Sequence, residues 1–250
     1  MNKEKNKRHH TERKYLDFST DSPVAEAYRV LRTNIEFSSS VNPIKTVLLT
    51  SAVSGEGKST TATNLGKIFA IGGTKTLIID FDLRKPVVHK ILKLDNEGMG
   101  ISAYIRENKT LDEIIVPTGF ENLYAITCDE IPLNPAEVLS SEKIAKMVEE
   151  LREKFDLIIF DSPPASSLAD AGIVSRMADA TIIVVSAGDV TYSDLEVAKN
   201  NLANAGAKIL GIVMNNMTKT ARGYKYYKYK YKNYYRYGYG YGYGYGKEER

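Results

Sequence analysis

The sequence predicts an α/β protein with a doubly wound, mostly parallel sheet, and three observations predict it. Short apolar segments of strand length alternate with segments of helical periodicity along most of the chain. The strand segments are apolar throughout, as expected when helices cover both faces of a sheet. Glycines at 72–73 and 206 supply stops for two of the helices. The predicted strands are 46–50, 76–80, 123–127, 157–161, 181–186 and 209–214, and the helices between them are 58–71, 135–154, 168–177 and 193–205.

A further helix is expected before the first strand. Residues 1–22 indicate a flexible basic arm, and a helix over 23–42 follows, with Asp21 or Ser22 as its cap. Its polar side carries Glu26, Arg29 and Arg32 at spacings of three, which places a carboxylate and two guanidinium groups along one face. Such a face suits pairing between subunits, and an exposed face with local ion pairs is the alternative.

Charge is distributed unevenly between the body and the C-terminal tail. The whole chain carries +3, whereas residues 221–250 hold eight basic residues against two glutamates and carry +6, which leaves −3 for residues 1–220. Cys128 is the single cysteine, so no intramolecular disulfide is possible and a reducing compartment is expected. The N-terminus lacks the apolar stretch of a secretory signal, and no apolar run reaches the roughly 18 residues that cross a bilayer. We therefore expect a cytoplasmic protein.

The C-terminal tail, residues 220–250, is rich in tyrosine and is expected to be disordered. Residues 224–250 contain twelve of the seventeen tyrosines, set among lysine, arginine and glycine, with no valine, leucine or isoleucine to bury. Such a tail offers many phenol hydroxyls as acceptors for a phosphoryl group. These tyrosines are Tyr224, Tyr226, Tyr227, Tyr229, Tyr231, Tyr234, Tyr235, Tyr237, Tyr239, Tyr241, Tyr243 and Tyr245.

A phosphate-binding pattern directly follows the first predicted strand. The run AVSGEGKS begins at Ala52, which replaces the usual first glycine of a P-loop, and a helix follows it. Gly55 and Gly57 allow backbone amides to surround phosphate oxygens, and the helix dipole adds to their effect. Lys58 is expected to reach the β- and γ-phosphates, and Ser59 to bind Mg²⁺. The predicted nucleotide-contacting residues are Ser54, Gly55, Glu56, Gly57, Lys58, Ser59 and Thr60.

Carboxylate side chains lie at the ends of the second and fourth predicted strands. Asp80 and Asp82 end the run IIDFD, and Asp161 ends LIIFD. A hydrolase or a kinase needs one carboxylate near the metal and another that accepts a proton from the nucleophile. Asp161 in this context is expected to bind Mg²⁺ through water. Capping of the following turn is the alternative for Asp80 or Asp82 alone. The three motifs together predict a site for ATP and Mg²⁺ in a fold of the P-loop NTPase type, with residues 43–219 as its domain. Asn215, after the last strand, either meets the nucleotide base or forms a turn.

These residues resemble the bacterial protein-tyrosine kinases of capsule and exopolysaccharide synthesis, in the form made as a separate cytoplasmic subunit in Gram-positive bacteria. The resemblance covers roughly residues 18–218 and the tail, and rests on the P-loop, IDFDLRKP, IIFDSPP, NPAEVL at 134–139 and the tyrosine cluster. It implies that Lys58 and Ser59 serve the nucleotide and the metal, that Asp82 and Asp161 bind the metal, and that Asp80 is the base. The family's oligomerisation pattern Glu-x-x-Arg-x-x-Arg matches Glu26, Arg29 and Arg32.

The resemblance implies an ATP-dependent tyrosine kinase that phosphorylates its own tail in trans and regulates capsular or exopolysaccharide synthesis and export. It also implies a homo-oligomer such as a ring, a membrane-embedded chain-length regulator that recruits the protein to the inner face of the membrane, and a cognate phosphatase, with no stable nucleic acid. Two alternatives remain open. One is a regulatory ATPase of the ParA/MinD kind, although these usually carry an additional lysine early in the P-loop. The other is a tail that binds nucleic acid or polysaccharide.

Overall fold

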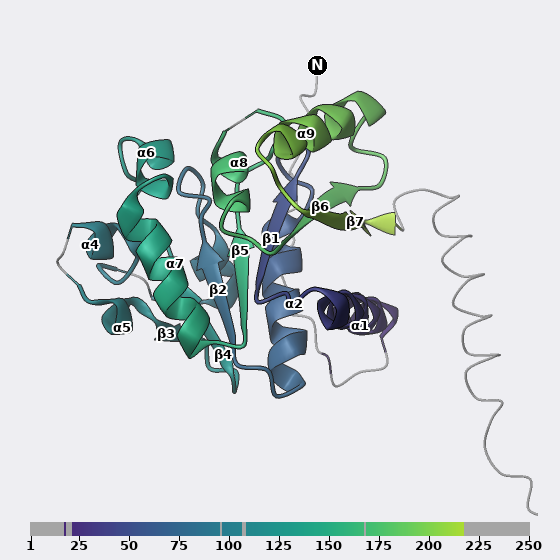
Figure 1. Ribbon diagram of the computed structural model, residues 1–250. Coiled ribbons are helices and arrows are strands. Elements are labelled where there is room, and N and C mark those ends of the chain that lie inside the picture. Colours follow the sequence, from purple (N-terminus) through teal and green to yellow (C-terminus); the bar gives the residue numbers. More distant parts are fainter. Residues whose placement is uncertain (1–17, 19–21, 96, 107–108, 168, 218–250) are drawn as a thin grey trace, which may run out of the picture.

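The computed structural model describes Phe18 and residues 22–95, 97–106, 109–167 and 169–217 (Figure 1). The tail 220–250 with its twelve tyrosines, and the arm 1–22 apart from Phe18 and Ser22, lie outside the described residues. The described chain forms one seven-stranded sheet with the order β3-β4-β2-β5-β1-β6-β7, parallel except for the short β3–β4 pair. The strands are β1 (Thr46–Ser51), β2 (Thr76–Asp80), β3 (Val116–Pro117), β4 (Leu123–Ile126), β5 (Leu157–Asp161), β6 (Ala180–Ser186) and β7 (Ile209–Asn215).

Helices cover both faces of this sheet, so the predicted doubly wound architecture is confirmed (Figure 1). Alternate residues of β1 show the two layers: Val47 packs with Ala25 of α1 and Leu65 of α2, whereas Leu48 packs with Met147 of α7. The helices are α1 (Pro23–Val41), α2 (Lys58–Ile71), α3 (Val88–Leu92), α4 (Ile101–Ile105), α5 (Leu111–Ile114), α6 (Pro135–Leu139), α7 (Glu142–Lys154), α8 (Asp170–Ser175) and α9 (Tyr192–Asn204).

The central strands are buried along their whole length, which explains their continuous apolar sequences. Every residue of β1, β2, β5 and β6 is buried. The edge strand β7 differs, because alternate residues are exposed along it. Its apolar sequence therefore does not reflect burial on both faces.

The segment between β4 and β5 differs most from the sequence-based expectation. The single helix predicted over 135–154 is two helices, α6 and α7, and Ser141 caps the second by accepting a hydrogen bond from the Ile144 amide at 3.4 Å. The helices α3, α4 and α5 and the strand β3 were not predicted. Each of them has five residues or fewer, which is too short for a periodic pattern to be readable.

The first helix begins where the sequence indicated and packs against the body of the domain. Ser22 is its cap, and the Ser22 hydroxyl accepts a hydrogen bond from the Ala25 amide at 3.1 Å. Ala25 and Ile35 are buried in the same core as β1 and α2. No helix among the described residues is long and apolar enough to cross a membrane.

Candidate active site

The P-loop connects β1 to α2 at the carboxyl edge of the sheet. Gly55 and Gly57 have φ angles of 92° and 89°, a left-handed conformation that strongly favours glycine. A Cβ atom on Gly57 would also lie 2.2 Å from the Asn215 side-chain nitrogen, so any larger residue there would clash. The loop is therefore shaped for close approach of a ligand to its backbone, as phosphate binding requires.

The Glu56 side chain connects the P-loop to β6 through hydrogen bonds. Its side chain is buried, and its two oxygens accept hydrogen bonds from the Val53 amide at 2.7 Å and the Ser186 amide at 3.0 Å. The backbone carbonyl of Glu56 accepts a further hydrogen bond from the Asn215 side chain at 3.0 Å. Glu56 was predicted as a nucleotide contact; in this geometry its carboxylate holds the P-loop against the end of β6, and its backbone carbonyl contacts the end of β7.

Lys58, the first residue of α2, lies between a carboxylate in the loop after β2 and one at the end of β5. Its Nζ atom is 2.8 Å from Asp82 Oδ2 and 3.4 Å from Asp161 Oδ1. Burial acts to lower the pKa of the Lys58 ammonium, but the negative charges of Asp161 and Asp82 outweigh burial, and the pKa is raised. Lys58 is therefore a stable cation, held by these two carboxylates where an anionic phosphate would be attracted.

The residues at this point fit a divalent cation bound together with nucleotide phosphates. Asp161 is fully buried, and its Oδ2 atom accepts no hydrogen bond within the described part of the chain. Burial raises the pKa of Asp161 although Lys58 opposes the rise, and a cation would relieve the same cost. Asp82 and Ser59 lie on the adjacent loop and helix, and oxygen atoms of this kind are the ligands that Mg²⁺ prefers. In the described residues no group of three or more His, Cys, Asp or Glu side chains forms a metal site.

Asp80 occupies a different environment from Asp82. It is fully buried, and its oxygens accept hydrogen bonds from the amides of Asp82 at 3.1 Å and of Val87 and Val88 at 3.0 Å each. Burial and the nearby charge of Asp161 raise the pKa of Asp80 to about 8, although the Val88 amide and Lys58 oppose the rise. Asp80 therefore shapes the loop that follows β2, and it also has the raised pKa that suits a base near neutral pH.

A cavity of about 460 Å³ opens beside these groups. Arg84, which also borders this cavity, binds the buried carboxylate of Asp170 through two hydrogen bonds of 2.7 and 3.1 Å. This pair could not be predicted from the sequence, because nothing in the sequence connects Asp170 to the second motif. Of the predicted site residues, Ser54, Gly55, Gly57, Lys58, Ser59, Thr60 and Asp82 line the cavity, whereas Glu56, Asp80, Asp161 and Asn215 do not.

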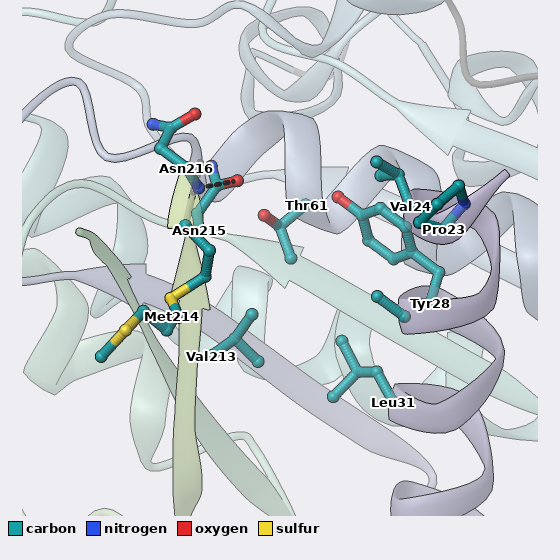
Figure 2. Close-up of a pocket in the computed structure, with 11 residues that line it drawn as sticks. Pro23, Val24, Tyr28, Leu31, Thr61, Val213, Met214, Asn215 and Asn216 are labelled. Atoms are coloured by element: carbon teal, nitrogen blue, oxygen red, sulfur yellow. Dashed lines mark hydrogen bonds between the residues drawn. The ribbon is translucent and has the colours of Figure 1, made fainter. Parts of the chain in front are cut away.

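Asn215 lines a second cavity, of about 590 Å³, between α1 and β7. Figure 2 shows Tyr28 and Leu31 of α1 facing Val213 and Asn215 across it. Most of its surface is apolar, with Asn215 and Thr61 among its polar members. This cavity lies beside the P-loop, since the Asn215 side chain contacts Glu56. Its position is compatible with both expectations for Asn215, because the Asn215 side chain also accepts a hydrogen bond from the Asn216 amide at 2.8 Å.

The three charged residues of α1 have contacts within one subunit. Arg29 pairs with Glu26 at 2.9 Å and donates to the Phe18 carbonyl at 2.9 Å. Arg32 donates to the Ile68 carbonyl in the last turn of α2 at 3.2 Å and lies 3.5 Å from Glu36. Arg32 therefore joins α1 to α2, a role that the spacing of the three residues did not indicate.

Comparison with known proteins identifies relatives over most of the chain. A family model described as an AAA domain matches residues 44–208. Tyrosine-protein kinase YwqD of Bacillus subtilis (strain 168) is 40% identical over 204 residues, which are 81% of this chain and 86% of that protein. Putative tyrosine-protein kinase CapB of Staphylococcus aureus is 38% identical over 215 residues, which are 85% of this chain and 94% of that protein.

Solved structures also match this chain over most of its length. The chimerical protein CapA2B2 matches with a TM-score of 0.75 and 34% identity, over 78% of this chain and 86% of that one. The kinase domain of Escherichia coli tyrosine kinase ETK matches with a TM-score of 0.75 and 29% identity, over 85% of this chain and 84% of that one. The septum site-determining protein MinD of Pyrococcus horikoshii, solved with Mg-ADP, has a TM-score of 0.61 and 23% identity over 71% of this chain and 72% of that one, and shares the fold alone.

Proposed function

This chain belongs to the family of bacterial tyrosine-protein kinases, and we propose that it transfers the γ-phosphoryl group of ATP to the tyrosines of its own tail. The observation that carries the proposal is the meeting of Lys58, Asp82 and Asp161 beside the P-loop cavity. A regulatory ATPase shares this fold, but it transfers the phosphoryl group to water and does not need twelve tyrosines at one terminus as acceptors. We therefore favour tyrosine over water as the acceptor.

Each polar group at the cavity has a task in this reaction. The P-loop amides bind the phosphates, and Lys58 exchanges its contact with Asp82 for the β- and γ-phosphates. Ser59, Asp82 and Asp161 hold Mg²⁺, which neutralises charge on the phosphates when it is bound. Asn215, which lines the cavity between α1 and β7, is proposed to contact the nucleotide base. The distances from Lys58 to Asp82 and Asp161 and the type of each group support these assignments.

Asp80 is proposed as the group that receives the proton of the acceptor tyrosine. A tyrosine hydroxyl has a pKa of about 10 and is a weak nucleophile while protonated. A carboxylate whose pKa is raised to about 8 is a stronger base than an ordinary one. Asp80 is buried behind the loop 81–87 in this structure. Its role therefore requires this loop to admit the tyrosine hydroxyl.

Assembly places the acceptor beside the site of a neighbour. We propose that α1 pairs subunits through Glu26, Arg29 and Arg32 in a homo-oligomer such as a ring, and that the tail of one subunit enters the site of the next. The family implies a function in capsular or exopolysaccharide synthesis and export. It also implies a cytoplasmic protein that a membrane-embedded chain-length regulator recruits to the membrane, and a phosphatase that reverses the modification.

The test is incubation of the purified full chain with Mg·ATP, followed by mass-spectrometric mapping of phosphate. We expect phosphotyrosine in the tail of the wild type, none in Lys58→Met, and a loss of about 10²-fold or more in rate in Asp80→Asn. Phosphotyrosine on a Lys58→Met chain incubated alone would rule out self-phosphorylation at this site. Deletion of 221–250 with loss of RNA or glycan binding would instead support a binding role for the tail.

A further inference from the structure

The outer edge of β7 meets no other strand in the part of the chain that the structure describes. β7 pairs with β6 on one side and ends the strand order, at the yellow-green edge of the sheet (Figure 1). Its sequence, ILGIVMN, contains no charged residue and no proline. Leu210, Ile212 and Met214 are 38%, 53% and 56% exposed. An uncharged, apolar edge strand is a template for another strand, and folded proteins usually cover or charge such edges.

The chain leaves the sheet from the end of this same strand. Asn216 has a φ angle of 54°, in the left-handed region, so the backbone turns there. The Asn216 side chain donates to Ser186 Oγ at 2.9 Å, which fixes the turn to the end of β6. The 33 residues from 218 to 250 follow this anchored turn. They are therefore joined covalently to the end of the strand whose outer edge is open.

One segment of these residues has the pattern of a strand. Residues 227–232 read YKYKYK, a strict alternation of tyrosine and lysine. Tyrosine is favoured in strands, and alternation places the tyrosines on one face and the lysines on the other. The later repeat, 238–246, also alternates, but it has glycine at every second position, and glycine weakens a strand. The segment 227–232 is therefore the best strand former in the tail.

We propose that residues 227–232 run back antiparallel to β7 and add a strand, the tail strand, to the sheet of their own chain. Residues 216–226 then form the connection, and eleven residues are sufficient to reverse the chain. Because the tether keeps the segment at an effective concentration of order millimolar, it competes well against a separate partner. The rings of Tyr227, Tyr229 and Tyr231 extend the apolar face of Ile212 and Met214.

This pairing would determine the order in which the tyrosines are phosphorylated. That consequence rests on the proposed kinase activity. While the tail strand is paired, Tyr227, Tyr229 and Tyr231 are withheld from an active site, and the tyrosines of 238–246 stay available. A phosphate on Tyr229 would add about −1.5 to −2 charges against an apolar edge, so a phosphorylated segment would not pair. Phosphorylation is therefore expected to begin in the glycine-tyrosine repeat.

Hydrogen–deuterium exchange on the full chain tests the pairing, in a Lys58→Met background that keeps the tail unphosphorylated. We expect amides of β7 and of 227–232 to exchange about tenfold more slowly than in Tyr229→Pro, because proline cannot join the ladder. Tyr241→Pro, the same substitution in the repeat, should leave the protection unchanged. Ile212→Lys should remove the protection. Ile131→Lys, at a position that is 62% exposed outside the edge, should not.

Two results would overturn the proposal. One is equal exchange of β7 in Lys58→Met and in Lys58→Met with Tyr229→Pro. The other is protection that increases with protein concentration, because it would assign the edge to a second copy. In the active chain, time-resolved mapping should find phosphate on Tyr239–Tyr245 before Tyr227–Tyr231, and the reverse order would refute the shielding. Absence of all phosphotyrosine would refute the proposed kinase function and leave the exchange result unaffected.

Discussion

Glu56 shows how one residue determines the shape of the site without lining the cavity. Its buried carboxylate joins the Val53 amide of the P-loop to the Ser186 amide of β6. A glutamine at this position keeps one acceptor oxygen but turns its NH₂ group toward one of the two amides. The P-loop would then lose a hydrogen bond and gain two facing donors, although every group that contacts phosphate would be retained.

We predict that Glu56→Gln lowers the free energy of unfolding by about 1–3 kcal/mol and raises KM for ATP. The rate at saturating ATP should change less, because a loosened loop weakens nucleotide binding before it alters the reacting groups. Thermal unfolding with and without Mg·ATP, together with steady-state kinetics, measures both effects. The control is Glu196→Gln, on the exposed surface of α9. If the two variants behaved alike, Glu56 would have no role in positioning the loop.

Some residues of the site could be predicted from the sequence, and the roles of others could not. Lys58, Asp82 and Asp161 could be predicted because each follows a buried strand whose apolar sequence marks its position. The role of Glu56 could not be predicted, since the P-loop pattern leaves its position free and its partner Ser186 lies 130 residues away. The Arg84–Asp170 pair could not be predicted for the same reason, since its members lie 86 positions apart in the sequence.

At the scale of elements, α1 has two functions that can be separated. Arg32 donates a hydrogen bond to the Ile68 carbonyl of α2. A Cβ atom on Gly72 would lie only 2.6 Å from a guanidinium nitrogen of Arg32, so the glycine leaves room for this contact. The Glu26 side chain contacts only Arg29 among the hydrogen bonds and ion pairs of the described residues. Both residues belong to the proposed subunit interface, but Arg32 alone also fixes α1 to the body of its own subunit.

We therefore predict different outcomes for substitutions in the two residues. Arg32→Ala should lower stability by about 1 kcal/mol, because it removes the hydrogen bond that joins α1 to α2 and leaves the Ile68 carbonyl with the Gly72 amide at 3.3 Å as its donor, and should also reduce assembly. Glu26→Ala should reduce assembly with a change in stability of about 0.5 kcal/mol or less. Urea unfolding at low protein concentration and light scattering at high concentration separate the two effects. Intact assembly in both variants would show that this face of α1 does not pair subunits.

A second element contact, far from the catalytic edge, gives a pH-dependent prediction. Asp179 accepts hydrogen bonds from the Lys45 and Thr46 amides at 2.8 and 2.9 Å and binds Arg152 of α7 at 3.0 Å. Burial acts to raise the pKa of Asp179, but the bonds from Arg152 and from the two amides outweigh it, and the pKa is lowered. The folded state therefore favours the ionised form more than the unfolded state does.

The sign of this effect follows from linkage. A lowered pKa stabilises the folded state above the unfolded pKa of about 3.9, and that stability is lost as pH falls through the folded pKa. Asp179→Asn should thus cost about 1–3 kcal/mol at pH 7, and the difference from wild type should narrow below about pH 4. Urea unfolding at pH 7, 4 and 3 measures this, with the exposed Asp95→Asn as control. A difference that stayed constant across this range would show that the charge of Asp179 is not responsible.

The short elements show why the sequence did not predict every part of the fold. The strands β1, β2 and β5 were predicted because parallel strands buried on both faces need continuous apolar sequence. Helix α4 was not, because only five residues form it and a distant contact stabilises it: Asp129, 27 residues from Ser102, accepts the Ser102 amide at 2.9 Å. The break between α6 and α7 was also missed, since serines at 140 and 141 are compatible with a continuing helix until one of them caps the next.

At the scale of the whole molecule, the P-loop is connected by short polar contacts to the point where the tail begins. The Glu56 carboxylate accepts a hydrogen bond from the Ser186 amide, and the Ser186 hydroxyl accepts one from the Asn216 side chain. The Asn215 side chain donates a hydrogen bond to the Glu56 backbone carbonyl. Asn215 and Asn216, which precede the tail, are thus held beside the P-loop of their own subunit, whereas we propose that the tail is used in the site of a neighbour. Charge is the property that can switch it between bound and released states, because the tail carries +6 and the remainder −3.

Complete phosphorylation of twelve tyrosines would change the tail from +6 to roughly −12 to −18 at neutral pH. Attraction between tail and body would become repulsion, and an assembly held by tail occupancy should dissociate. We predict a smaller mass by light scattering after incubation with Mg·ATP, and recovery of the larger mass after treatment with a tyrosine phosphatase. Because exposed charges are screened over about 8 Å at physiological ionic strength, the change should be greater at low salt. Lys58→Met with Mg·ATP is the matched control and should keep its mass. An unchanged mass in a wild type whose tail is fully phosphorylated would show that tail charge does not control assembly.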